Sequence, residues 1–241
     1  MKKEKKILTF IGARGGSKGL KDKNILLFAG KPLIAWSIES SLSSKHISKT
    51  IVSTDSEVIA KVALEYGATV PFMRPSELAT DTSNIYDAIR HSLHALNAQG
   101  ESFDYIVLLQ PTQPLRPNGF LDSVIDYYFS NQKSDLDSLI SVKEIDPKYN
   151  LLMELTNENY LRYLNFSNPN VVNRQDLKKL YLVSGVIYIA PVKKILSGDR
   201  FDFGNVLHFV TDDLVSSDID TKEDFDQALI NYNILKSQGR L

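Results

Sequence analysis

Short runs of apolar, often β-branched residues alternate with longer amphipathic stretches along the first half of the chain. Continuous apolar runs bounded by turn residues predict buried strands, here at Ile7–Ile11, Thr50–Ser53, Thr69–Phe72 and Tyr105–Leu109. Helical periodicity lies between them, near Pro32–Ser43, Glu57–Tyr66 and Ile85–Ala98. Pro32 suits a first helical turn, and Gly67 follows a helix end. This alternation predicts an α/β fold with a doubly wound, mostly parallel sheet.

The pattern changes after about residue 135, beyond a further helix expected near Gly119–Phe129. Apolar runs then follow one another closely between polar turns, at Leu136–Val142, Leu151–Leu155 and Tyr160–Leu164. They predict a small β-rich insertion at about residues 136–170. Strands at Gly185–Ala190 and Val206–Val210 and a helix from about Thr221 to Lys236 follow. Without repeats or a Pro/Gly/Ser-rich linker, residues 1–241 are expected to form one domain with an inserted subdomain.

Composition narrows the class of protein. Of the 241 residues, 43% are hydrophobic and 24% charged, which is enough apolar material for a large core. The formal net charge of −1 provides no global field for nucleic acid or an anionic membrane. The absence of cysteine excludes disulfides and thiolate metal sites. The first apolar run is too short for a signal peptide or a membrane span, so we expect a cytoplasmic protein.

A glycine-rich basic segment directly follows the first predicted strand. It reads Gly12-Ala13-Arg14-Gly15-Gly16-Ser17-Lys18-Gly19. Glycines allow several backbone N–H groups to reach phosphate oxygens, and Arg14 and Lys18 add charges that would neutralise a triphosphate. The segment fits neither the Walker pattern nor the dinucleotide-binding fingerprint. Because ligands gather at the carboxyl ends of strands in such sheets, the loops after Ile11, Ser53 and Leu109 should face one site.

Two aspartates near the C-terminal helix form a candidate metal site. If Asp218, Ile219 and Asp220 are extended, both carboxylates lie on one face and the isoleucine on the other. Mg²⁺ usually takes one or two carboxylates and completes its shell with water and phosphate oxygens. A local alternative is that Asp220 and Thr221 cap the following helix, with Asp224 three residues beyond Thr221. The residues alone leave both readings open.

Other polar residues carry weaker signals. Pro111 cannot continue a central strand, so the chain must turn there and leave Gln110 either near the cleft or capping the strand end. The four histidines, His46, His91, His94 and His208, form no metal-binding triad. The serines lack a nucleophile-elbow pattern, so covalent catalysis is not expected.

Seven segments, in order along the chain, resemble the CMP-sialic acid synthetases (acylneuraminate cytidylyltransferases). They are Arg14–Gly19 with Asn24, Ser53–Asp55, Arg74–Thr82, Leu108–Arg116, Arg174–Leu177, Ser184–Ile189 and Asp218–Thr221. The resemblance implies a Rossmann-like nucleotidyltransferase that transfers CMP from CTP to the anomeric hydroxyl of a sialic-acid-like nonulosonic acid and releases pyrophosphate. It also implies a homodimer built through the insertion.

The same resemblance implies roles for individual residues. Nucleotide contacts would come from Arg14, Gly15, Gly16, Ser17, Lys18, Asn24, Arg74 and Ser83, and sugar contacts from Gln110 and Ser184. Arg174 would stabilise the transferring phosphorus or hold the sugar carboxylate. Asp218 and Asp220 would bind Mg²⁺ (or Mn²⁺). The structural alternatives are a turn role for Asn24, a solvent-facing Arg74 and an ion pair between Arg174 and Asp176.

Two departures from the family concern the acceptor. Relatives usually have arginine where this chain has Asn173, and asparagine where it has Ser184. The sugar could therefore also be legionaminic acid, pseudaminic acid or the eight-carbon acid Kdo. A non-catalytic nucleotide-sugar binding protein is the alternative outside enzymes.

Overall fold

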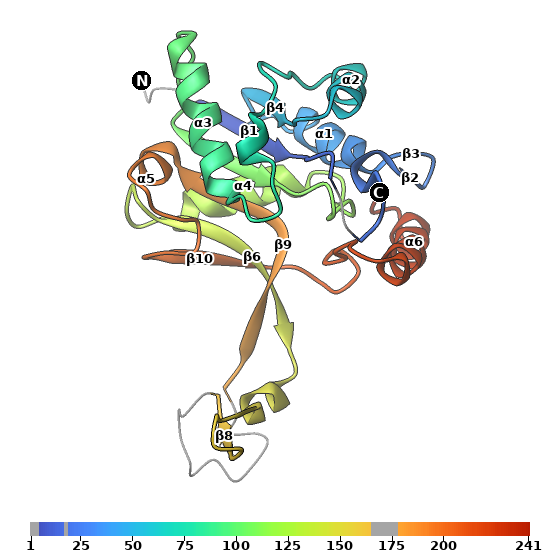
Figure 1. Cartoon of the computed structure of the whole chain (residues 1–241), viewed down its shortest axis with the longest axis vertical. Coiled ribbons are helices and arrows are strands. Elements are labelled where there is room, and N and C mark those ends of the chain that lie inside the picture. Colours follow the sequence, from blue (N-terminus) through green and yellow to red (C-terminus); the bar gives the residue numbers. More distant parts are fainter. Residues whose placement is uncertain (1–4, 17–18, 165–177) are drawn as a thin grey trace.

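The computed structural model describes residues 5–16, 19–164 and 178–241. Its centre is a six-stranded sheet with the order β10-β6-β9-β5-β1-β4 (Figure 1). The strands are β1 (Ile7–Gly12), β4 (Lys49–Ser53), β5 (Tyr105–Leu109), β6 (Ser138–Ile145), β9 (Leu180–Pro191) and β10 (Val206–Val210). Strand β9 is antiparallel to both of its neighbours, and the remaining pairs are parallel. The mostly parallel sheet predicted from the sequence is therefore confirmed.

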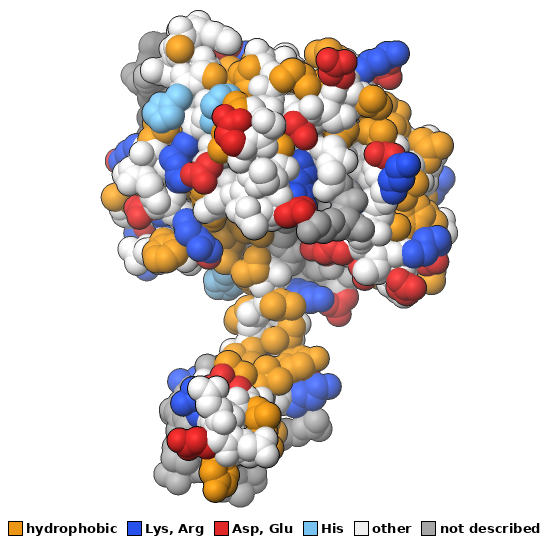
Figure 2. All heavy atoms as spheres, viewed as in Figure 1, with side chains coloured by type: hydrophobic (Ala, Val, Ile, Leu, Met, Phe, Trp, Pro, Cys, Tyr) orange, Lys and Arg blue, Asp and Glu red, His pale blue; other side chains and the backbone are white. Residues whose placement is uncertain are grey.

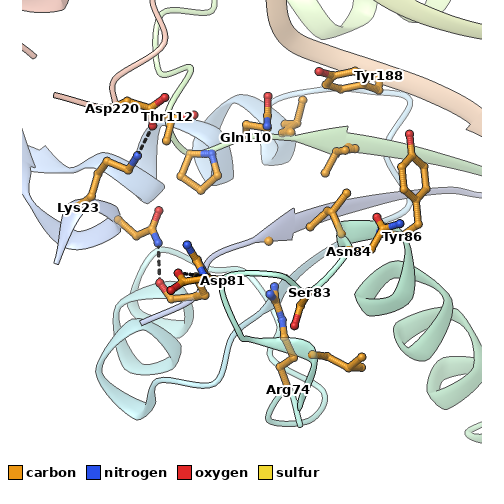
Figure 3. A pocket seen from close by; sticks show the side chains of 18 of the residues that line it. Lys23, Arg74, Asp81, Ser83, Asn84, Tyr86, Gln110, Thr112, Tyr188 and Asp220 are labelled. Atoms are coloured by element: carbon orange, nitrogen blue, oxygen red, sulfur yellow. Dashed lines mark hydrogen bonds and ion pairs between the residues drawn. The ribbon is translucent and has the colours of Figure 1, made fainter. Parts of the chain in front are cut away.

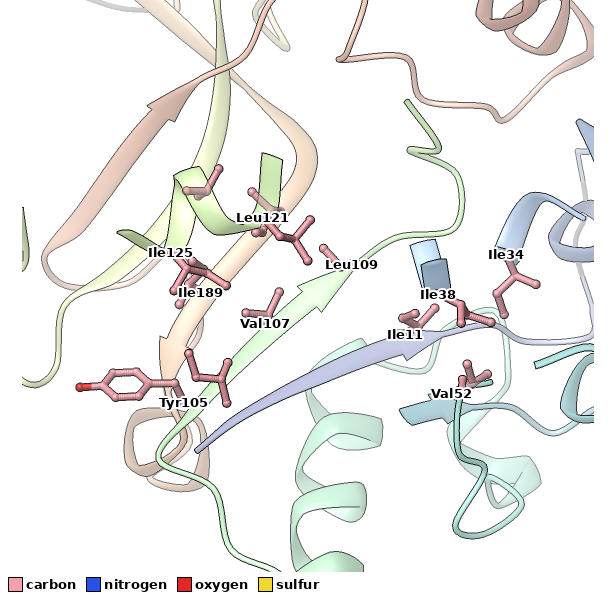
Figure 4. Packing of buried hydrophobic residues seen from close by; sticks show 14 of the residues in the cluster. Ile11, Ile34, Ile38, Val52, Tyr105, Val107, Leu109, Leu121, Ile125 and Ile189 are labelled. Atoms are coloured by element: carbon pink, nitrogen blue, oxygen red, sulfur yellow. The ribbon is translucent and has the colours of Figure 1, made fainter. Parts of the chain in front are cut away.

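Helices cover both faces of the sheet, as a doubly wound fold requires. They are α1 (Leu33–Leu42), α2 (Glu57–Glu65), α3 (Ile85–Ala98), α4 (Phe120–Asn131), α5 (Val192–Leu196) and α6 (Lys222–Ser237). Side chains of β1 alternate between two apolar clusters. Ile7 and Ile11 pack with α1 and α4, whereas Leu8 and Phe10 pack with α3. Figure 4 shows the first cluster, with Ile11 near Ile38 of α1.

Short elements shape the loops around the sheet. Between β1 and α1 the chain forms the 3₁₀ turn η1 (Lys23–Ile25) and a hairpin of β2 (Leu27–Phe28) and β3 (Lys31–Pro32). A second 3₁₀ turn, η2 (Ser76–Leu78), precedes α3. The strand predicted at Thr69–Phe72 is wrong, because only Thr69 forms a bridge, with Ile51. Pro71 has no N–H to continue a ladder.

A narrow arm extends from the sheet, formed by the ends of β6 and β9. Their pairing continues beyond Val142 and Val183 to Ile145 and Leu180. The 3₁₀ turn η3 (Pro147–Leu151) and the hairpin of β7 (Met153–Leu155) and β8 (Leu161–Tyr163) lie at its tip. Figure 1 shows the arm standing away from the body, and Figure 2 shows hydrophobic side chains along it. The start predicted for the β-rich insertion, at about residue 136, is therefore wrong: residues 138–142 pair with β10 in the central sheet, and the arm begins beyond them. Residues 165–170 of the predicted insertion lie outside the described residues.

No helix within the described ranges is long and apolar enough to cross a membrane.

Candidate active site

A cleft of about 760 Å³ opens at the carboxyl ends of β1 and β5 (Figure 3). Gly12 ends β1 and Gln110 follows β5, and both residues line the cleft. A Cβ added at Gly12 would lie 2.9 Å from Ile85 Cδ1 and 3.2 Å from the Arg74 guanidinium, so a larger residue here would require these side chains to shift. The loops after Ile11 and Leu109 face one cleft, as expected, whereas the segment directly after Ser53 does not line it.

The glycine-rich loop is held by the segment that follows β4. The Gly15 N–H donates to the Asp55 carboxylate at 2.9 Å, and the Ala13 N–H donates to the Ser53 carbonyl at 3.0 Å. These bonds fix the path of the loop as it leaves β1. Gly16 is exposed, whereas Ser17 and Lys18 lie outside the described residues.

The side chain of Asn24 is hydrogen-bonded to the main chain of Arg14. Asn24, in η1, is buried, and its amide Nδ2 donates to the Arg14 carbonyl at 3.0 Å. The Arg14 guanidinium forms an ion pair with Asp81 at 2.7 Å. Both Arg14 and Asn24 line the cleft. In this structure Asn24 supports the loop, and recognition of a cytosine ring by its amide stays a prediction.

Arg74 is buried at the base of the cleft, so the alternative of a solvent-facing arginine is wrong. Its Nε donates to the Ser53 hydroxyl at 3.0 Å and its Nη2 to the Ser53 carbonyl at 2.5 Å. Burial lowers the pKa of Arg74, although the nearby Asp55 opposes this effect. Ser83 also lines the cleft, and its hydroxyl donates to the Glu77 carbonyl at 2.9 Å.

The two candidate metal ligands lie on the same side of their segment. Asp218 and Asp220 are exposed to solvent, while Ile219 between them is fully buried, as the predicted alternation requires. The Ile219 N–H donates to the Thr112 carbonyl at 2.9 Å and so fixes the segment beside the end of β5. Asp220 lines the cleft, while Asp218 interacts with the Thr112 side chain. Desolvation by the surrounding protein raises the pKa of Asp218, and the charge of Asp220 raises it further.

Helix capping uses neighbouring groups and does not involve the Asp220 carboxylate. Thr221 is the N-cap of α6, and its hydroxyl accepts a hydrogen bond from the Asp224 N–H at 3.2 Å. The Asp224 carboxylate accepts from the Thr221 N–H at 2.8 Å and the Asp220 N–H at 3.1 Å. Thr221 and Asp224 therefore form the capping box. Asp220 contributes only its backbone to it.

The loop after β1 and the segment before α6 meet in one wall of the cleft. A Cβ added at Gly19 would collide with the backbone carbonyl of Asp220. The Lys23 ammonium lies 2.6 Å from the Asp220 carboxylate, across 197 positions of sequence (Figure 3). Lys23 was not singled out from the sequence, because nothing local distinguishes it from the nearby Lys21.

These residues fit a divalent cation. Two carboxylates of like charge stand close enough for one to raise the pKa of the other, and the Lys23 ammonium now supplies the compensating charge at Asp220. The described part of the chain contains no group of three or more His, Asp and Glu that could hold a metal by itself. Mg²⁺ requires no such group, since water and substrate phosphates complete its octahedron.

Of the two residues predicted to contact the sugar, Gln110 lines the cleft and Ser184 does not. Gln110 lines the cleft, and its backbone carbonyl accepts from the Ser37 hydroxyl at 3.1 Å and from the buried Arg116 at 3.2 Å. Gly185, at φ +75°, faces the Gln110 side chain, where a Cβ would approach its Oε1 to 2.6 Å. Ser184 is buried behind the cleft wall, and its Oγ lies 3.0 Å from the Thr211 hydroxyl. Arg174 and Asn173 lie outside the described residues.

A polar cluster that the sequence did not reveal lines the other end of the cleft. Arg200 donates to both carboxylate oxygens of Asp202, at 2.9 Å and 2.8 Å. Tyr86 at the start of α3 and Tyr188 of β9 stand beside this pair. Burial raises the pKa of Tyr188 to about 12, so this hydroxyl stays protonated at neutral pH.

Comparison with known proteins gives a consistent result. Residues 8–238 match the sequence family described as cytidylyltransferase. A pseudaminic acid cytidylyltransferase from Campylobacter jejuni is 34% identical over 230 residues, which cover 95% of this chain and 97% of that protein. A CMP-N,N′-diacetyllegionaminic acid synthase from Legionella pneumophila is 38% identical over 202 residues, covering 81% of this chain and 82% of the relative.

Two further similarities extend the comparison. An N-acylneuraminate cytidylyltransferase from Streptococcus agalactiae is 34% identical over 91% of this chain, which spans only 52% of that relative. The solved structure of a CMP:2-keto-3-deoxy-manno-octonic acid synthetase complexed with CTP superposes with a TM-score of 0.69. It covers 96% of this chain and 99% of that one. Because only 15% of the residues are identical, the similarity to this solved structure concerns the fold alone.

Proposed function

Because this chain belongs to the cytidylyltransferase family, we propose that it transfers CMP from CTP to the anomeric hydroxyl of a nonulosonic acid and releases pyrophosphate. The observation that carries the proposal is the meeting of the glycine-rich loop with Asp220 and Lys23 in one cleft. Relatives named for pseudaminic, N-acylneuraminic and legionaminic acids support the acceptor class.

The reaction is a direct displacement. The anomeric hydroxyl oxygen forms a bond to the α-phosphorus of CTP and releases its proton to solvent. The bond between the α-phosphorus and the oxygen shared with the β-phosphorus breaks, and pyrophosphate leaves. Such reactions depend on positioning and on neutralising charge on the phosphates. Arg14 and Lys23, which pair with Asp81 and Asp220 in this structure, would supply positive charge from one wall once phosphates and a cation exchange with these pairs. Asp218 and Asp220 would hold Mg²⁺ (or Mn²⁺), which would add charge neutralisation at the triphosphate.

N-acylneuraminic acid is the first acceptor that we propose, because seven segments resemble the enzymes that activate it. Pseudaminic and legionaminic acids are the alternatives, since relatives named for them share similar fractions of identical residues with this chain. All three are nine-carbon acids with a carboxylate at the anomeric carbon, so the same displacement serves each of them.

We also propose that the chain forms a homodimer through its arm. Large apolar side chains there stand in solvent: Tyr160 is 72% exposed, Leu161 63% and Leu155 63%. Contiguous exposed apolar surface on a soluble protein usually marks an interaction site. A second copy with the same arm offers a self-complementary partner around a two-fold axis.

The decisive experiment measures pyrophosphate release from CTP and Mg²⁺ with N-acetylneuraminic, pseudaminic and N,N′-diacetyllegionaminic acids. We expect turnover with at least one acid, little turnover with UTP or ATP, and loss of turnover with EDTA that excess Mg²⁺ reverses. CTP binding without pyrophosphate release for any acid would instead support the nucleotide-sugar binding protein and overturn the proposed enzyme.

A further inference from the structure

The end of the cleft remote from the glycine-rich loop has a distinct chemistry. In Figure 3, Lys23 and Asp220 stand at one side, and Tyr86 and Tyr188 stand at the other, with Gln110 between them. Arg200 and Asp202 line the cleft together with the two tyrosines. None of these four residues has been assigned to the triphosphate or to the cation, so this end is available to the second substrate.

The Arg200–Asp202 pair is fixed in orientation. Its two hydrogen bonds, at 2.9 Å and 2.8 Å, align the guanidinium with the carboxylate. The Tyr86 hydroxyl lies 3.4 Å from Asp202, and the Arg200 guanidinium carbon lies 5.5 Å from the centre of the Tyr86 ring. Each side chain still has solvent access, at 49% for Arg200 and 40% for Asp202. Unused N–H groups and carboxylate lone pairs therefore remain for a ligand.

The loop that carries the pair is anchored in the core. Phe201, between the two charged residues, is fully buried, and its ring centre lies 5.8 Å from that of Tyr86 and 5.7 Å from that of Tyr188. The buried Lys194 donates to the Phe203 carbonyl at 2.5 Å and to the Ser138 hydroxyl at 2.8 Å. Because these contacts already hold the loop in place, a ligand that binds there does not have to order it, and little conformational entropy is lost.

The charge of the pair indicates which part of the acceptor it suits. Arg200 and Asp202 neutralise one another, so the pair offers no free cation for a carboxylate. A hydroxyl group can donate to the Asp202 oxygen and accept from an Arg200 N–H at the same time. A nonulosonic acid has one carboxylate, on the reacting anomeric carbon, and a neutral hydroxyl- or amide-bearing arm on the carbon at the other side of the ring oxygen. The arm therefore matches the pair and the carboxylate does not.

On the basis of the proposed function, we propose that Arg200 and Asp202 bind the neutral arm of the acceptor and determine which acids are used. The nucleotide and cation occupy the Lys23 and Asp220 side, and the acceptor extends from Gln110 past Tyr188 to this pair. Selection among acids then depends on the hydrogen-bonding groups of the arm. An acid whose arm lacks these groups leaves the pair without its partners.

The test uses Asp202→Asn and Arg200→Gln in the full chain, with Asp226→Asn as a control. Asp226 pairs with Lys222 on the exposed face of α6 and does not itself line the cleft. Turnover is measured with the preferred acid and with a synthetic analogue whose arm ends at carbon 7. We expect each cleft variant to raise the KM for the preferred acid about tenfold and leave the KM for CTP within twofold. The control should match the wild type.

The ratio of kcat/KM for the two acceptors is the decisive readout, because any loss of folded protein cancels in it. The wild type should prefer the full-length acid about tenfold, and both cleft variants should lose most of that preference. An unchanged ratio in both variants, or a rise in the KM for CTP alone, overturns this assignment. Absence of pyrophosphate release by the wild type with every acid would instead refute the proposed function.

Discussion

Residues with the same local context differ sharply in what they contact. Lys21 and Lys23 are two positions apart in one loop, yet Lys21 is exposed and Lys23 pairs with Asp220. That partner comes from the far end of the chain, so no local pattern could have selected Lys23. The place of the glycine-rich loop after a buried strand and the shared face of Asp218 and Asp220 were predictable from residue type and spacing, whereas their roles toward phosphate and metal stay predictions. The Arg200–Asp202 pair was not predictable, since ion pairs of that kind are common on surfaces.

Replacing Lys23 tests its electrostatic role. Lys23→Met keeps the length of the side chain and removes the charge beside Asp220, so kcat/KM should fall about 10²-fold. Steady-state pyrophosphate release is the measurement, and thermal unfolding checks that the variant folds. Lys21→Met is the control and should stay near wild-type activity. A Lys23→Met enzyme within threefold of wild type would contradict the role.

The contact between Gly19 and Asp220 gives a second prediction. Gly19→Ala places a methyl group against the Asp220 backbone carbonyl, which cannot rotate away. We expect a loss of about 1–3 kcal/mol in the free energy of unfolding and a drop of several degrees in Tm. Gly16→Ala is the matched control, because a Cβ there meets no atom within 4 Å. Equal Tm values for both variants would contradict the close approach of Gly19 to the Asp220 carbonyl.

Among the helices and strands, several end points were predicted correctly where a strongly periodic run lies between turn or capping residues. The helix Ile85–Ala98 and the strands Tyr105–Leu109 and Val206–Val210 have the bounds that the pattern predicts. The direction of β9 was not predictable, because an apolar run has the same pattern whether it pairs parallel or antiparallel. Its length was underestimated for a related reason: residues 180–184 belong to the ladder that extends into the arm.

The turn between α4 and β6 supplies a pH-dependent prediction. The Lys133 N–H donates to the Asp137 carboxylate at 2.7 Å, and this bond lowers the pKa of Asp137 below its ordinary 3.8. A carboxyl whose pKa falls on folding stabilises the protein above its unfolded pKa, and this contribution is lost as the pH falls through the folded pKa. Asp137→Asn should therefore reduce stability by about 1–2 kcal/mol at pH 7.

Thermal unfolding between pH 7 and pH 3 measures this effect. The difference in Tm between wild type and Asp137→Asn should persist down to the unfolded pKa and shrink below it. Asp135→Asn is the control in the same turn. The Asp135 side chain is 82% exposed, and its ion pair with Lys193 is long, at 3.7 Å, so its loss should change stability little. A difference that stays constant across the whole range would mean that the charge of Asp137 contributes nothing.

For the molecule as a whole, the arm is the main departure from a compact body. The sequence predicted a β-rich insertion there, and the resemblance predicted its use in dimerisation. Its projection could not be predicted, because the exposed leucines and tyrosines are the residue types that would otherwise fill a core. Only the position of β6 and β9 in the sheet determines where their free ends extend.

A charge on the arm tests the proposed homodimer. Leu161→Glu in β8 should convert a dimer into a folded monomer, which light scattering coupled to size exclusion would measure. Leu27→Glu in β2 is the control, because Leu27 is similarly exposed, at 66% against 63% for Leu161, and lies outside the arm. A wild-type protein with the mass of one chain would contradict the dimer directly.

The place of β9 between β5 and β6 also governs the order in which the sheet can be completed during translation. Strands β1, β4 and β5 leave the ribosome early and can pair with one another at once. Strand β6 emerges before both β9 and β10, its two neighbours in the described sheet. A nascent chain halted short of residue 180 consequently presents open strand edges on β5 and β6, the kind of surface that chaperones recognise and aggregates recruit.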